Sequence, residues 1–115
     1  MSDDALIVLL EWVPEFAPRV LDMVAAGDDL PDPANILGEF AAFVSEAATA
    51  RAAPVALLER CAVALESLAT RLDDEDGEEL VGWCFFDALA AAARRQLEVH
   101  LGPAAAALAA CVDGS

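Results

Sequence analysis

The chain has 115 residues, the size of one domain with a single core, and its 58% apolar content excludes a disordered or low-complexity protein. It carries 21 acidic residues and six arginines without a lysine, so its formal net charge is −15 at pH 7. Because nucleic acids and anionic membranes bind clustered basic residues, this charge argues against both as partners, and the lack of lysine excludes lysine-based catalysis.

The first half of the chain is expected to form three helices. Apolar residues recur every three or four positions along the chain and nowhere alternate with period two, which predicts an all-α fold. We expect a first helix over about residues 3–12, ended by Pro14, and a second over about 14–27. The third covers about residues 33–51, with Asp32 as its N-cap.

The second half is expected to form two long helices and a short one. Residues 54–72 give the clearest amphipathic helix of the chain. Its apolar face consists of Leu58, Cys61, Ala62, Leu65, Leu68, Ala69 and Leu72. A fifth helix over 78–102 is apolar on nearly all sides from 80 to 93, which predicts a central position, and Pro103 begins a closing helix to about Val112. The chain is thus predicted to be one all-α domain, residues 1–115, an antiparallel bundle of five to six helices whose hairpins can stack.

Acidic residues gather in the loops at one end of this bundle. Because short loops make sequential helices antiparallel, the start of the third helix, the end of the fourth and the start of the fifth share one end. We call the carboxylates of these loops the acidic pole: Asp28, Asp29, Asp32, Asp73, Asp74, Glu75 and Asp76. The opposite end is expected to carry Arg51, Arg94, Arg95 and His100. The acidic pole is either a docking surface for a basic protein or a set of solvated charges that keeps the chain soluble.

Asp87 interrupts the apolar stretch 80–93, which is also too short to span a membrane. A buried charge without a partner costs several kcal/mol, so we expect a buried Asp87 that is paired with a cation or caps another helix. The alternative is a cleft in which Asp87 binds a ligand or acts as an acid.

The sequence has no motif for catalysis, a cofactor or a metal site. The acidic loop 73–77 lacks the spacing of an EF-hand, and its carboxylates offer a divalent cation only weak binding. Cys61, Cys84 and Cys111 are expected to be reduced, buried thiols without zinc-ligand spacing, as is typical of the cytoplasm. His100 is expected near a helix C-terminus, where the dipole favours a positive charge, rather than as a general base.

Four short motifs occur in a fixed order along the chain. They are Leu-Glu-Trp-Val-Pro-Glu-Phe at 10–16, Leu-Gly-Glu-Phe-Ala-Ala-Phe at 37–43, Phe-Phe-Asp-Ala-Leu at 85–89 and Leu-Gly-Pro at 101–103. Together they resemble a family of small, acidic bacterial helical domains of unknown function, and the resemblance covers nearly the whole chain. Such domains are similar in size, acidity and helix order to toxin-immunity proteins, which implies inhibition by binding and no catalytic residues.

The sequence therefore predicts a cytoplasmic, non-catalytic binding protein. Its acidic pole would bind a basic protein partner. The most specific form of this hypothesis is an immunity protein that neutralises a basic toxin by direct binding. The alternative is a homodimer or other homo-oligomeric structural or regulatory domain, joined through apolar surface on its first or last helix, whose charge serves solubility alone. An enzyme that uses Asp87 with His100 is a third hypothesis, which no motif supports.

Overall fold

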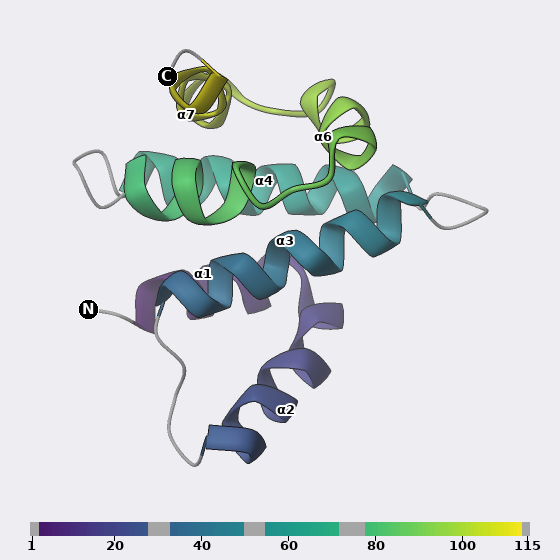
Figure 1. Ribbon diagram of the computed structural model, residues 1–115, viewed down its shortest axis with the longest axis vertical. Coiled ribbons are helices and arrows are strands. Elements are labelled where there is room, and N and C mark those ends of the chain that lie inside the picture. Colours follow the sequence, from purple (N-terminus) through teal and green to yellow (C-terminus); the bar gives the residue numbers. More distant parts are fainter. Residues whose placement is uncertain (1–2, 28–32, 50–54, 72–77, 114–115) are drawn as a thin grey trace.

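The computed structural model describes residues 3–27, 33–49, 55–71 and 78–113. Within these ranges all regular structure is helical, which confirms the predicted all-α fold (Figure 1). The α-helices are α1 (Asp3–Trp12), α2 (Ala17–Gly27), α3 (Pro33–Thr49), α4 (Val55–Arg71), α6 (Ala91–Glu98) and α7 (Pro103–Asp113). A 3₁₀ helix, η1 (Pro14–Phe16), precedes α2, and a π-helix, η2 (Glu78–Phe86), follows α4.

Prolines set several helix boundaries, as the sequence predicts. Pro14 cannot donate a backbone hydrogen bond, so α1 ends at Trp12 and Pro14 opens η1. The amide of Val13 still donates to the carbonyl of Leu9 at 2.8 Å, and the amide of Phe16 donates to Val13 at 3.0 Å. This corner turns the chain sharply between α1 and α2 and places the Phe16 ring in the core.

Helix α3 lies at the centre of the molecule, in contact with α1, α4, η2 and α6. The rings of Phe16, Phe40, Phe85 and Phe86 are all buried. Their centroids are 5.0 Å apart for Phe16 and Phe40, 5.5 Å for Phe40 and Phe85, and 5.0 Å for Phe85 and Phe86. This line of rings joins the η1 corner to α3 and η2, and such aromatic pairs add about 0.5–1.5 kcal/mol each beyond burial.

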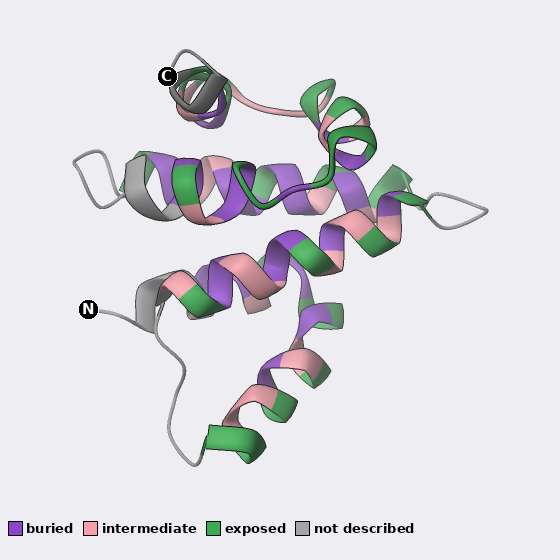
Figure 2. Ribbon diagram, in the orientation of Figure 1, coloured by how far each residue is buried: buried purple, intermediate pink, exposed green. Residues whose placement is uncertain are grey.

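Burial is uneven among the helices (Figure 2). Buried residues run along α3 and α4, where the predicted apolar face of α4 is confirmed from Leu58 to Ala69. Helix α2, by contrast, extends away from the other helices in Figure 1, and Val20 is its buried residue. Leu72, also predicted to lie on the apolar face of α4, is outside the described residues.

The predicted continuous helix over 78–102 is wrong, because the chain breaks after η2. The amide of Asp87 closes the last wide turn on the carbonyl of Gly82 at 3.1 Å, and Ala90 is then extended (φ −62°, ψ 142°). The amide of Ala90 donates instead to the Ser45 hydroxyl of α3 at 3.1 Å, and α6 starts at Ala91. Because of the break, η2 and α6 can each bury one face against the core. A single unbroken helix with this apolar sequence would have to be surrounded by other helices on all sides.

Helix α7 is capped by a side chain from α4. The Glu66 carboxylate accepts hydrogen bonds from the amides of Ala104 at 3.2 Å and Ala105 at 2.9 Å, two donors that the first turn of a helix leaves unpaired. A Cβ at Gly102 would lie 2.5 Å from Glu66 Cδ, so only glycine leaves room for this cap.

We predict that Gly102→Ala lowers the free energy of unfolding by about 1 kcal/mol, because Glu66 must move away and the cap is lost. Gly38→Ala is the matched control, because a Cβ at this position of α3 meets nothing within 4 Å and alanine favours a helix. Urea unfolding measures both variants. If the two substitutions change stability equally, or if the effects of Gly102→Ala and Glu66→Ala simply add, the cap has been misidentified.

Candidate functional site

The elements that flank the acidic pole meet on one side of the molecule. Figure 1 shows the first turn of α3, the last turn of α4 and the first turn of η2 on the same side, with α4 running opposite to α3 and η2. The carboxylates of the pole themselves lie outside the described residues: Asp28, Asp29, Asp32, Asp73, Asp74, Glu75 and Asp76. Arg51, expected at the opposite end, also lies outside them, whereas Arg94 and Arg95 are on α6.

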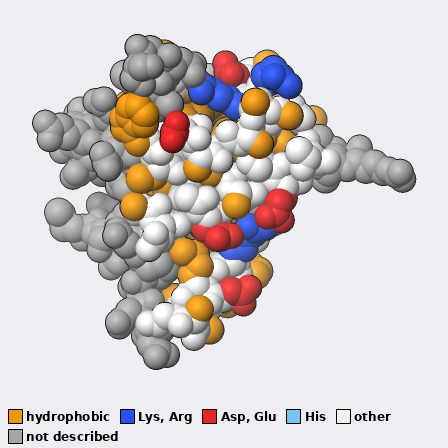
Figure 3. All heavy atoms as spheres, in the orientation of Figure 1, with side chains coloured by type: hydrophobic (Ala, Val, Ile, Leu, Met, Phe, Trp, Pro, Cys, Tyr) orange, Lys and Arg blue, Asp and Glu red, His pale blue; other side chains and the backbone are white. Residues whose placement is uncertain are grey.

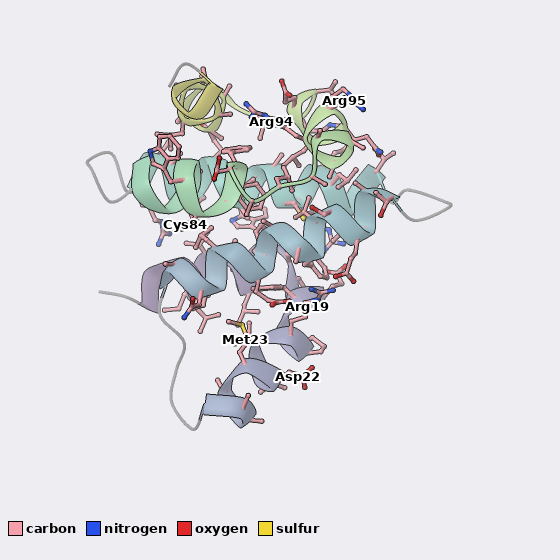
Figure 4. The ribbon with its side chains drawn as sticks, in the orientation of Figure 1. Arg19, Asp22, Met23, Cys84, Arg94 and Arg95 are labelled. Atoms are coloured by element: carbon pink, nitrogen blue, oxygen red, sulfur yellow. The ribbon has the colours of Figure 1, made fainter. Side chains whose placement is uncertain are left out.

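Three arginines of the described helices, Arg19, Arg60 and Arg94, pair with carboxylates of the same chain, and Figure 3 shows basic side chains next to acidic ones on one face. Arg19 of α2 is the clearest case (Figure 4). Its Nη1 donates to Glu39 Oε2 at 2.6 Å, its Nη2 pairs with Glu46, and its guanidinium lies 5.5 Å from the centroid of the Phe43 ring. The hydrogen bond to Glu46 is the main reason why the pKa of Arg19 is raised. Arg19 thereby fastens α2, which has little buried surface, to α3.

Arg60 of α4 holds the corner between α1 and η1. Its two terminal nitrogens donate to the two carboxylate oxygens of Glu15 at 2.8 and 2.5 Å, and Nη1 also approaches the carbonyl of Trp12 at 3.4 Å. This two-point pairing uses the planar fork of the guanidinium. The hydrogen bonds from Arg60 lower the pKa of Glu15 from its ordinary value of 4.5.

Arg94 connects α6 to η2 and α7. Its Nη2 donates to the carbonyl of Ala109 at 3.1 Å, its Nε lies 3.5 Å from Glu98 Oε1, and its guanidinium is 5.7 Å from the centroid of the Phe86 ring. Together with Arg19 and Arg60, it shows that positive charge in this fold is used to join helices. Most of the chain's 21 acidic residues have no arginine to pair with, because the sequence contains only six.

An open groove of about 460 Å³ lies between α2 and α3. Arg19, Asp22 and Met23 line it from α2, together with Ala26, and Glu39 lines it from α3 (Figure 4). Among its described lining residues the basic group is that of Arg19, which is already bound by Glu39.

A second open groove, of about 330 Å³, contains His100. Its lining residues are Val63, Glu66, Ser67, Thr70, His100 and Gly102. The Thr70 hydroxyl donates to the Ser67 carbonyl, and the Glu66 carboxylate caps α7, so both are used within the fold. Asp87 is not among the lining residues, so this groove does not bring Asp87 and His100 together.

The expectation that Asp87 is buried is wrong. Asp87 is exposed, and no charged or polar residue is buried in the part of the chain that the structure describes. The physical reason is the break after Phe86: Asp87 lies at the turn that leaves η2, so its charge stays in water. Trp83, four residues earlier, is also on the outside of η2 with 40% of its surface exposed.

Cys61 is a buried thiol, as expected, and burial raises its pKa to about 12. It is therefore a neutral, unreactive group at physiological pH. Cys84 is half-buried, and the side chain of Cys111 lies outside the described part. Over the residues with a described position, no three His, Cys, Asp or Glu side chains form a group that can hold a metal ion.

Comparison of the chain with protein-family models, with curated proteins and with solved structures finds no match. The resemblance to immunity domains therefore stays a prediction. Among the helices of the described ranges, none has both the length and the apolar character that crossing a bilayer requires.

We predict that Glu15→Gln destabilises the protein most at pH values above about 4.5 and progressively less as the pH falls below that value. A carboxyl whose pKa is lowered on folding adds stability above its unfolded pKa, and this stability disappears as the pH falls through the folded pKa. Urea midpoints measured from pH 7 to pH 3 test this, with Glu11→Gln on the exposed side of α1 as the control. A deficit of Glu15→Gln that is as large at pH 3 as at pH 7 would contradict the ion pair with Arg60.

Proposed function

We propose that this protein acts without catalysis by binding a basic protein partner, and that the partner is a toxin which it neutralises. The observation that carries the proposal is the net charge of −15 in a fold whose arginines Arg19, Arg60 and Arg94 are bound by the chain's own carboxylates. The acidic excess is therefore available to an external cation. In the groove that contains His100, the Glu66 carboxylate caps α7 and the Thr70 hydroxyl bonds to the Ser67 carbonyl, so these groups already serve the fold.

Such a charge acts mainly on the rate of association. A field of one sign draws in an oppositely charged protein, orients it, and loses strength as salt screens it over about 8–10 Å. It also opposes self-association, because two copies of the chain each carry −15. The homo-oligomeric alternative would have to overcome this repulsion with apolar contacts.

The direct test is capture followed by kinetics. The wild-type chain serves as bait in an extract of its native cells, beside a control bait with Asp73→Asn, Asp74→Asn, Glu75→Gln and Asp76→Asn. We expect the wild-type bait to retain a basic protein that the control bait retains poorly. With the purified partner, the association rate constant should fall on the order of tenfold or more between about 20 and 500 mM salt. An association rate that is independent of salt, or equal retention by both baits, would refute the proposal.

Toxin neutralisation makes a separate prediction. Expression of the captured partner alone should arrest growth, and co-expression of this chain should restore it, whereas the control bait should restore it less. A partner whose expression leaves growth unchanged would exclude the toxin version and retain the binding function.

A further inference from the structure

The chain's own arginines show what surroundings this fold gives to a guanidinium. Arg19 lies over the Phe43 ring with Glu39 beside it, and Arg94 lies over the Phe86 ring with Glu98 beside it. An aromatic face and a carboxylate together suit a guanidinium, because the planar cation stacks on the ring while its N–H groups donate to the carboxylate.

The same combination occurs, exposed, on η2 and the turn after it. Trp83 is 40% exposed and Asp87 is exposed, while the neighbouring Phe85 and Phe86 are buried. The amide of Asp87 bonds to the carbonyl of Gly82, five residues back, so the wide winding continues to Asp87. A residue four positions after Trp83 therefore lies one turn further along the same side of the helix.

No ion pair within the described ranges includes Asp87. The other exposed tryptophan, Trp12, provides an internal comparison, since 39% of its surface is exposed. Its neighbouring carboxylate, Glu15, is already bound by Arg60, whose Nη1 also approaches the Trp12 carbonyl. An arginine of the chain thus already binds the carboxylate that follows Trp12, whereas among the described residues no ion pair binds the carboxylate that follows Trp83.

We propose that Trp83 and Asp87 together bind an arginine side chain of the basic partner. This inference rests on the proposed function, which gives the partner a positive charge. A positively charged partner complements the net charge of −15 of this chain. Arginine fits better than lysine because only a planar guanidinium can lie on the indole and donate to the carboxylate with two N–H groups. Exposed tryptophans at the centre of an interface commonly supply a large share of the affinity.

The site is tested first with a peptide. The indole N–H groups of Trp12 and Trp83 give two signals in a ¹H–¹⁵N spectrum, and Trp12→Phe assigns them. Acetyl-Gly-Arg-Arg-Gly-amide is added at low salt, with the Lys-Lys and Gln-Gln peptides as controls. We expect a saturating shift of the Trp83 signal that is largest with arginine and absent with glutamine, while the Trp12 signal stays in place. Asp87→Asn should weaken binding about two- to fivefold. Equal shifts of the two indole signals, equal shifts with the glutamine peptide, or unchanged binding to Asp87→Asn would overturn the inference.

The captured partner provides the second test and separates the two proposals. Trp83→Leu should raise the dissociation constant about tenfold or more, whereas the equally exposed Trp12→Leu should have a much smaller effect. If a basic partner associates with the expected salt dependence but binds Trp83→Leu and wild type equally, this inference is wrong and the proposed function stands. If the arginine peptide shifts Trp83 but the captured partner is acidic or associates independently of salt, the proposed function fails while the arginine site remains.

Discussion

The end of η2 at Phe86 is the constraint on which the rest of this structure depends. Phe85 and Phe86 are held in the line of aromatic rings that starts at Phe16, and the chain must turn directly after them. The Ser45 hydroxyl of α3 accepts a hydrogen bond from the amide of Ala90, which the break in the helix would otherwise leave unpaired. The turn places α6 against α3, and it leaves Asp87, like Trp83, exposed to water. Core packing and the proposed binding surface therefore have a common origin.

Three of the few arginines of the chain connect helices to one another. Arg19 joins α2 to α3, Arg60 joins α4 to the η1 corner, and Arg94 joins α6 to α7. Each of these three arginines also pairs with a carboxylate of the same chain, so that the remaining acidic residues dominate the outer field. A partner that is attracted by this field would supply basic side chains to pair with the unpaired carboxylates. The function that we propose thus follows from how few arginines the chain has and where they are bound.

Local signals predicted most of the helix boundaries. Pro14 ends the first helix, Gly27 ends the second and Pro103 begins the last, because each acts through its own backbone chemistry. The apolar face of α4 is also a local pattern. The break inside 78–102 has no such signal, since no glycine or proline lies between Trp83 and Gly102. It results from packing that the sequence does not display, namely the rings on α3 and the hydroxyl of Ser45.

The candidate site was less predictable for the same reason. The pairing of Arg60 with Glu15 joins positions 45 residues apart, and that of Arg19 with Glu39 joins positions 20 apart. A buried Asp87 was a reasonable expectation within an uninterrupted apolar helix, and it failed with the helix itself. The spacing of four between Trp83 and Asp87 is visible in the sequence, but it indicates a shared exposed side only once the end of η2 is known.

Backbone chemical shifts of residues 78–98 test this account most directly. Because shifts of ¹³Cα and ¹³C′ distinguish helical from extended residues, the structure predicts helical values through Phe86, an extended value at Ala90 and helical values again from Ala91. An uninterrupted helical pattern from residue 78 to residue 98 would contradict it. In that case the exposure of Asp87, and with it the arginine site, would lose its structural basis.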